Sequence, residues 1–148
     1  MLRVTVVALL LALAGVLLYV RLSPNPPSRW HVDPLLVQPP DTPNYHLIRP
    51  AGGDAAAPIY DMTPSALAEA IDRVARAAGA RLLGGSVENG HMTYITRTPW
   101  LGFPDFSSGK VTAAGDGATF AAFARARFGR SDMGVNRARL RRWIDALA

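Results

Sequence analysis

Arginine is the residue type through which this sequence could most readily bind a ligand. The chain has 16 basic residues, all of them arginine except Lys110, against 11 acidic ones, which leaves a formal net charge of +5. A guanidinium group binds a carboxylate or a phosphate through two parallel hydrogen bonds. Because Arg97, Arg125 and Arg127 fall on predicted strands, one interpretation is a binding module for an anionic small molecule or a lipid headgroup.

The acidic residues near these arginines support a second interpretation, an ion-pair network that only stabilises the fold. In it, Asp105 and Asp132 pair with the strand arginines, Asp132 also caps the last helix, and Asn136 links backbone across the junction. Such networks perturb charges without any chemistry, and we favour this interpretation. Both interpretations use the same candidate residues, which are Arg97, Asp105, Arg125, Arg127, Asp132, Asn136 and Arg137.

The sequence offers no complete catalytic set. The absence of cysteine excludes thiol nucleophiles, thiolate zinc sites and iron–sulfur clusters. Ser107 and Lys110 have the serine–lysine spacing of penicillin-binding enzymes, but they fall in a predicted hairpin and lack the companion motifs. The 3 histidines lack the spacing of metal ligands. We therefore expect no catalytic residue, metal or cofactor, and keep a hydrolase centred on Asp105 and Ser107 as a third alternative.

An apolar segment at the N-terminus predicts a membrane anchor over residues 1–22. Residues 4–20 contain no charge and lie between Arg3 and Arg21. As a helix they would cover about 26 Å, close to a hydrocarbon core of about 30 Å, and the flanking arginines could snorkel. The alternative is a cleaved signal peptide, but cleavage after Ala14 would leave the apolar residues 15–20 on the product. Tyr19 and Trp30 are of the type that settles at the membrane interface.

The short N-terminal tail favours one orientation of this anchor. With the amino terminus inside, the chain would be a single-pass inner-membrane protein with its globular domain in the periplasm. The lipid bilayer is then the first expected partner, contacted by residues 4–20.

A proline-rich stalk is predicted over residues 23–45. Proline blocks helices and central strands, so the stalk should be extended and semi-rigid. Trp30, Leu35 and Leu36 are too apolar for a free spacer, and we expect them to contact a partner or the chain's own domain. The stalk contains seven prolines, Pro24, Pro26, Pro27, Pro34, Pro39, Pro40 and Pro43.

Residues 46–148 are expected to form one α+β domain of two layers, a four-stranded antiparallel sheet and two helices. The first helix should begin at Thr63-Pro64, an N-cap followed by proline, and end at Gly79. Ser131-Asp132 should cap the last helix. Strands are predicted over residues 82–87, 92–98, 106–114 and 118–128, with short candidates at 46–49 and 58–62.

Alternation along the last strand sets the direction of its arginines. Successive side chains of a strand point to opposite faces of the sheet. Arg125 and Arg127 should therefore share one face, together with Phe123. The apolar Phe120, Ala122 and Ala124 should take the other.

Several motifs of the chain are similar to those of one family. They are RWHVDP at residues 29–34, YITRT at 94–98, GFPD at 102–105 and, above all, the closing stretch RARFGRSDMGVNRARLRRW at 125–143. The chain resembles a bacterial and plastid family catalogued as a domain of unknown function, number fourteen ninety-nine in that series. The resemblance implies a small exported or membrane-anchored protein, and no activity comes with it. This chain has Ala126 where the closing motif usually has serine.

These expectations point to a membrane-anchored, non-enzymatic interaction module, an accessory or assembly subunit of an inner-membrane complex. Other subunits of that complex would be its partners. Respiratory complexes are the commonest large hosts of one-helix subunits, and we take them as the expected host. Nucleic acid is not an expected partner, because the chain has an anchor and lacks a stacking-aromatic motif.

Overall fold

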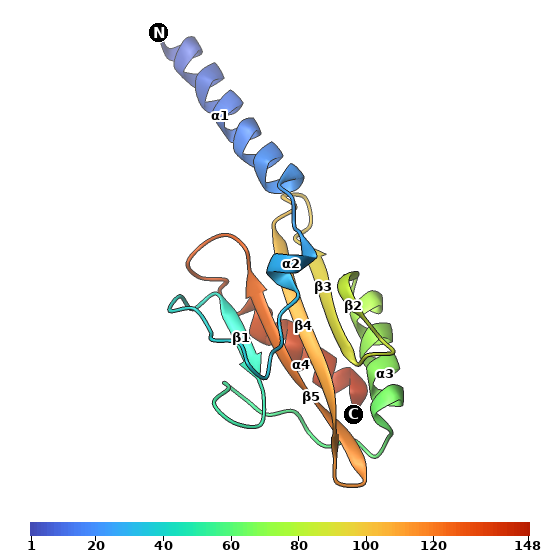
Figure 1. Cartoon of the computed structure of the whole chain (residues 1–148). Coiled ribbons are helices and arrows are strands. Elements are labelled where there is room, and N and C mark those ends of the chain that lie inside the picture. Colours follow the sequence, from blue (N-terminus) through green and yellow to red (C-terminus); the bar gives the residue numbers. More distant parts are fainter.

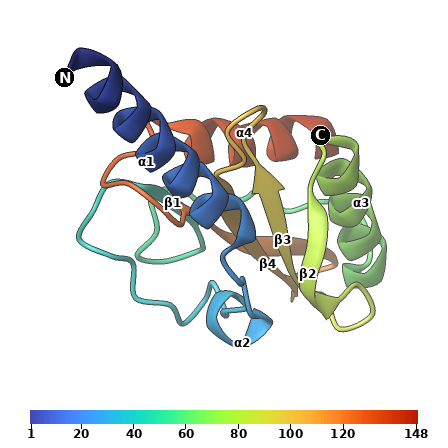
Figure 2. The same ribbon diagram turned by 90° about the horizontal axis from the view of Figure 1, so that it is seen from above.

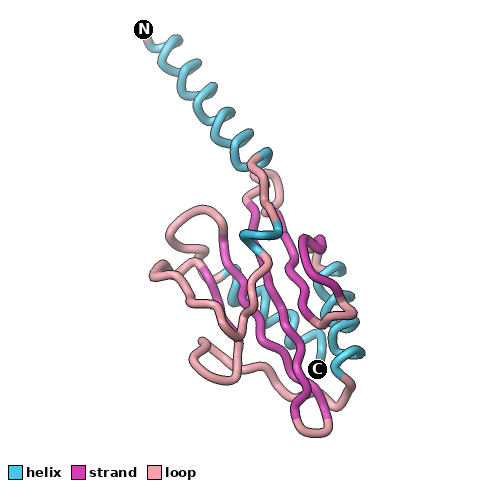
Figure 3. Tube along the Cα trace, viewed as in Figure 1, coloured by secondary structure: helices cyan, strands magenta, loops and turns pink.

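A helix that stands apart from a sheet domain is the main feature of the computed structural model, which describes residues 1–148 (Figure 1). The helices are α1 (Leu2–Leu22), α2 (Pro27–Trp30), α3 (Pro64–Ala77) and α4 (Val135–Leu147). The strands are β1 (Tyr45–Ile48), β2 (Arg81–Ser86), β3 (His91–Arg97), β4 (Pro104–Ala114) and β5 (Gly117–Ala126). Loops connect them, the longest joining β1 to α3 (Figure 3).

The strands form one antiparallel sheet in the order β1-β5-β4-β3-β2. The predicted α+β class is confirmed, with five strands where the sequence predicted four. The additional strand is β1, which pairs with β5 so that Tyr45 lies opposite Arg125 and Ile48 opposite Ala122. The candidate strand at residues 58–62 is wrong, since only one bridge, Tyr60 to Ala118, forms there.

Two helices cover one face of the sheet and build the main core (Figure 2). Helix α3 begins where predicted: Pro64 is its first residue and the Thr63 hydroxyl accepts a hydrogen bond from the Ala66 amide at 3.2 Å. Gly79, just past its end, takes the left-handed conformation that glycine favours, with φ +81. The largest fully buried side chains of this core are Trp143, Tyr94, Phe120, Ile48, Leu67, Ile71, Met92 and Leu140.

The opposite face of the sheet is covered by the linker, residues 23–37, which includes α2 (Figure 1). Trp30 stacks on Phe106 with ring centroids 3.9 Å apart and is only 8% exposed. The predicted docking is therefore confirmed for residues 23–37 of the stalk, and the surface they cover belongs to the chain's own domain. Burying a large apolar side chain contributes about 1.5–3 kcal/mol at most, which offsets part of the entropy lost by the linker.

Helix α1 projects away from the domain, and nearly all of it is exposed (Figure 1). It has 21 residues and a mean hydropathy of 2.3, so it is long and apolar enough to cross a membrane. A signal sequence near the N-terminus meets the same criterion. Val20, at the base of the helix, is the one buried residue of α1.

Candidate functional site

The linker is held on the sheet by five basic side chains of the domain, which we call the linker cradle: Arg49, His91, Lys110, Arg125 and Arg127. They come from β3, β4, β5 and the residue that follows each of β1 and β5. Their polar partners on the linker are mostly backbone carbonyl oxygens. A carbonyl oxygen accepts hydrogen bonds from a guanidinium as a ligand oxyanion would, so the linker takes the place of a ligand.

Arg125 lies at the centre of the cradle. Its guanidinium donates to the Trp30 carbonyl oxygen and, at 3.2 Å, to the Ser108 hydroxyl. It also lies 5.6 Å from the Trp30 ring and 4.6 Å from that of Phe123, within the range of cation–π attraction. Burial lowers the pKa of Arg125 to about 10, so the group still carries its charge at neutral pH.

Arg127 holds the start of the linker. It donates to the Pro24 carbonyl oxygen at 2.8 Å and to the amide oxygen of Asn25. Strand alternation correctly placed it on the same face as Arg125. Both guanidiniums thus bind the chain itself, and Arg97 donates to a different segment, the β3–β4 loop.

Two histidines fix the middle of the linker. Nδ1 of His31 lies 2.9 Å from the Thr93 hydroxyl, and the His31 and His91 rings lie 4.0 Å apart. Nε2 of His91 lies 3.0 Å from the Val32 carbonyl oxygen. Burial, together with the neighbouring His91, lowers the pKa of His31, so the neutral ring is the form that the docked linker favours.

An ion pair and a further arginine hold the second half of the linker. Lys110 pairs with Asp33. Burial raises the pKa of Asp33, but hydrogen bonds from Lys110 and the Leu35 amide outweigh burial, and the net shift is downward. Arg49 donates to the carbonyl oxygens of Leu35 and Val37 at 3.3 and 3.1 Å.

The acidic candidates lie on the other face and form a separate network. Asp105 pairs with Arg139 of α4 at 2.8 Å, and Arg139 also donates to the side-chain oxygen of Asn136. Asp132 lies two residues before Gly134, the N-cap of α4, and its carboxylate accepts from the Asn136 backbone amide at 2.9 Å and side-chain amide at 2.8 Å. Burial raises the pKa of Asp105, although Arg139 opposes the shift.

This network corrects part of the structural interpretation. Ser131-Asp132 is not the N-cap itself, which is Gly134, but the Asp132 carboxylate does accept from the Asn136 amide in the first turn of α4. The pairing of Asp105 and Asp132 with the strand arginines is wrong, because both acids face the helices while Arg125 and Arg127 face the linker. Arg97 pairs with neither acid and donates to the Gly102 carbonyl oxygen at 2.7 Å.

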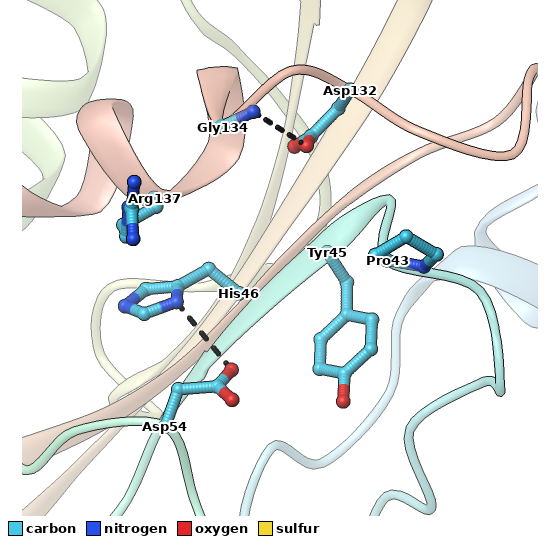
Figure 4. Close-up of a pocket in the computed structure, with 7 residues that line it drawn as sticks. All are labelled: Pro43, Tyr45, His46, Asp54, Asp132, Gly134 and Arg137. Carbon is cyan, nitrogen blue, oxygen red and sulfur yellow. Dashed lines mark hydrogen bonds and ion pairs between the residues drawn. The ribbon is translucent and has the colours of Figure 1, made fainter.

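Arg137 lies in a shallow polar pocket between β1 and the start of α4 (Figure 4). The pocket has a volume of about 490 Å³ and is also lined by His46, Asp54 and Asp132. Nδ1 of His46 lies 3.4 Å from Asp54. Burial lowers the pKa of His46 in spite of Asp54. The pocket is lined by both positive and negative groups. No group of its acids and histidine could hold a metal ion.

The three predicted partner contacts differ in exposure. Trp30 is covered by Phe106 and Arg125, so of its two expected contacts, a partner or the chain's own domain, the structure shows the second. Leu35 is half-buried. Leu36 is 75% exposed and remains available.

Sequence reasoning missed Arg49, His91 and Lys110 of the cradle and Arg139 of the acidic network. Strand alternation could have indicated Lys110. Phe106 lies opposite Arg125, and Lys110 follows Phe106 by four residues on the same face of β4, so it shares the face of Arg125. Nothing in the sequence shows that a carbonyl oxygen of the chain itself would be the partner.

A family model described as a protein of unknown function (DUF1499) matches residues 31–147. The chain belongs to this family. The DUF1499 match confirms the resemblance, and it begins within the linker, so His31 and Asp33 belong to the matched region together with the strands they contact. No curated protein and no solved structure matches the chain.

Proposed function

We propose that this DUF1499 chain is a membrane-anchored, non-enzymatic interaction module, an accessory or assembly subunit of an inner-membrane complex with its sheet domain in the periplasm. Respiratory complexes are the proposed class of host. Helix α1 would cross the bilayer, and the domain would present its exposed linker and edge surfaces to the other subunits.

The observation that carries this proposal is the fixed joint between α1 and the domain. Arg21 donates to the carbonyl oxygens of Trp100 and, at 3.4 Å, Leu101. Tyr19 packs edge-on against Phe128 at 6.1 Å. A signal peptide needs no contact with the mature domain, whereas an anchor that sets the position of the domain needs one.

The surroundings of the would-be catalytic residues support a non-enzymatic role. Ser107 is 1% exposed, and Asp105 is 6% exposed and paired with Arg139. Ser107 and Lys110 lie on opposite faces of β4, since Ser107 faces the helices and Lys110 binds Asp33 of the linker. A substrate would have no route to Ser107 or Asp105 without unfolding the core.

Leu36 is the residue through which we expect a partner to bind. It lies on the docked linker and is held outward by the bonds from Arg49 to the carbonyl groups on either side of it. A rigid apolar group on a polar surface is suited to contact another subunit, because little entropy is lost when it binds.

The test is photo-crosslinking in native membranes, with a crosslinking amino acid at Leu36 and a control at Asp116. Asp116 is exposed at the tip of the β4–β5 hairpin, at the end of the domain away from α1 (Figure 1). We expect the chain to resist alkaline carbonate extraction, to migrate in mild detergent as a stoichiometric complex, and to crosslink from Leu36 to one integral membrane subunit.

Two results would overturn the proposal. One is a mature chain whose mass corresponds to a start at Gly15, which would make α1 a cleaved signal. The other is a chain that migrates alone, with crosslinks no more frequent from Leu36 than from Asp116.

A further inference from the structure

The β3–β4 loop, residues 98–103, lies at the base of α1 (Figure 1). It presents two apolar side chains to solvent. Trp100 is 92% exposed and Leu101 49%. The loop is closed by bonds from the Thr98 amide to the Phe103 carbonyl oxygen at 2.9 Å and from the Phe103 amide to the Thr98 hydroxyl at 3.0 Å. Trp100 therefore sits at the tip of a closed turn and not on a loose end.

The backbone of Trp100 adopts a conformation that bulky residues seldom take. Its φ is 65, in the left-handed region, where a large side chain is strained. Strain of this kind persists where the surrounding structure enforces it, and it is frequent at sites of function. No burial of the indole ring within the chain offsets this strain, because the ring is exposed to water.

The loop is joined directly to the end of α1. Arg21 donates to the carbonyl oxygens of Trp100 and Leu101, and Arg97 donates to that of Gly102. A side chain at position 102 would meet Arg21, since a Cβ there would lie 3.0 Å from its Cγ, and Gly102 has φ +78. The apolar tip and the last turn of the predicted membrane helix therefore lie at one level.

The charge around the loop is positive. No acidic residue precedes Asp33 in the chain, so α1 and the start of the linker carry only Arg3, Arg21 and Arg29 as charged side chains. Arg21, Arg97 and Trp100 line a cavity of about 350 Å³, together with Thr98 and Gly102. The N–H groups of Arg21 and Arg97 that make no bond within the chain lie beside the exposed indole of Trp100. This combination suits the membrane interface, where tryptophan is enriched and lipid phosphates accept hydrogen bonds.

We propose that the β3–β4 loop is a second membrane contact: Trp100 and Leu101 enter the interfacial region of the bilayer beside α1, and Arg21 and Arg97 bind the phosphates of anionic lipids. The inference rests on the proposed anchoring by α1. With two points of contact, the helix and the loop, the domain has one fixed tilt on the membrane. The sequence placed Trp30 at this interface, and the structure assigns the place to Trp100.

Tryptophan fluorescence of the full chain in vesicles can test this contact. The chain has 3 tryptophans, and Trp30 and Trp143 are 8% and 2% exposed, so the emission lost in Trp100→Phe isolates Trp100. In vesicles of phosphatidylcholine and phosphatidylglycerol, lipids brominated near the headgroup end of their chains should quench this emission. Acrylamide dissolved in the water should quench the Trp100 emission far less than it quenches the emission of a tryptophan peptide that is fully exposed to water.

Two further arms assign the role of the arginines and of the anchor. Arg97→Gln, or vesicles of phosphatidylcholine alone, should reduce the quenching by brominated lipid. If the chain resists carbonate extraction but its Trp100 emission is quenched by acrylamide and not by brominated lipid, the loop contact is wrong and the anchor stands. If carbonate extracts the chain, both proposals are overturned. Equal quenching in both vesicle compositions would overturn the binding of anionic lipid.

Discussion

The two faces of the five-stranded sheet are covered in different ways. On one face α3 and α4 close over a cluster of 16 buried apolar residues, whereas the linker face has a cluster of only three, Trp30, Ile95 and Phe106. Because apolar burial is the dominant favourable contribution to folding, the helix-covered face must supply most of the stability. The linker face depends instead on charged donors that bind carbonyl oxygens.

This difference indicates that the two faces have separate tasks. Apolar packing on the helix side contains most of the buried apolar side chains and should stabilise the domain even when the linker detaches. Directional hydrogen bonds on the linker side fix where the linker lies, and through it where α1 leaves the domain. Substitutions on the helix-covered face should therefore lower the stability of the domain, whereas substitutions on the linker face should detach the linker.

The largest effect should come from Asp105→Ala on the helix-covered face. It leaves the buried guanidinium of Arg139 without its carboxylate, and breaking a buried ion pair in this way costs about 3–5 kcal/mol. Urea denaturation of the full chain in detergent, followed by circular dichroism, measures the loss. Replacing both Asp105 and Arg139 by leucine removes the unpaired charge and should recover part of it. A single variant as stable as the wild type would mean that the pair contributes nothing to this face.

Arg125→Ala should have the largest effect on the linker face. It removes the donors to Trp30 and Ser108, a loss of about 1–3 kcal/mol for hydrogen bonds in a buried site. The emission of Trp30 should shift to the red as the linker detaches, while the circular dichroism of the domain is retained. Arg142→Ala, at an exposed position of α4, is the matched control and should change neither. If the Trp30 emission shifts to the red and the circular dichroism of the domain is lost at the same time in Arg125→Ala, the two faces do not unfold separately.

Lys110→Met should have a smaller effect. The side chains of Lys110 and Asp33 are 34% and 20% exposed, and ion pairs open to solvent contribute only about 0–1 kcal/mol. The difference between this variant and the wild type should shrink further when salt is raised, because salt screens exposed charges. A loss as large as that of Arg125→Ala, unchanged by salt, would place this pair among the main supports of the linker.

The smallest effect should be a dependence of linker docking on pH. The pKa of His31 is lowered when the linker is docked, whereas in the unfolded chain it has its ordinary value of about 6.5. Docking is therefore fully favoured above that value and weakens as the pH falls through it, since the free linker takes up the proton more readily. Denaturation midpoints at pH 7.5 and 5.5 should differ less in His31→Gln than in the wild type. His46, whose pKa is also lowered, remains in both chains and cancels in this comparison.

Most of the fold could be predicted from local signals. Thr63-Pro64 and Gly79 bound α3 as expected, and alternation in β5 assigned both faces correctly. The pairing of β1 was missed because its partner lies in β5, far along the chain, and pairing between distant segments leaves no local pattern.

Several residues of the candidate site could be predicted from the sequence, but the groups to which they form hydrogen bonds could not. Alternation placed Arg125 and Arg127 together, and the position of Asp132 before the last helix indicated its contact with the first turn, although Gly134 is the N-cap. Backbone carbonyl oxygens are present at every residue, so no sequence pattern shows which of them an arginine will bind. The sequence likewise indicates that Trp30 is too apolar for a free linker, but it does not show that the ring stacks on Phe106 of the chain's own domain.

Hydrogen exchange across residues 29–38, measured on the full chain in its membrane, tests the docking of the linker most directly. In the docked linker the His31 amide donates to the Pro27 carbonyl oxygen at 2.8 Å and the Val37 amide to that of Asp33 at 2.9 Å. We predict slow exchange of both amides in the wild type and fast exchange in Arg125→Ala, while the amides of the β4–β5 ladder stay protected in both. Exchange of every amide from 29 to 38 at the rate of an unstructured chain in the wild type would contradict the account.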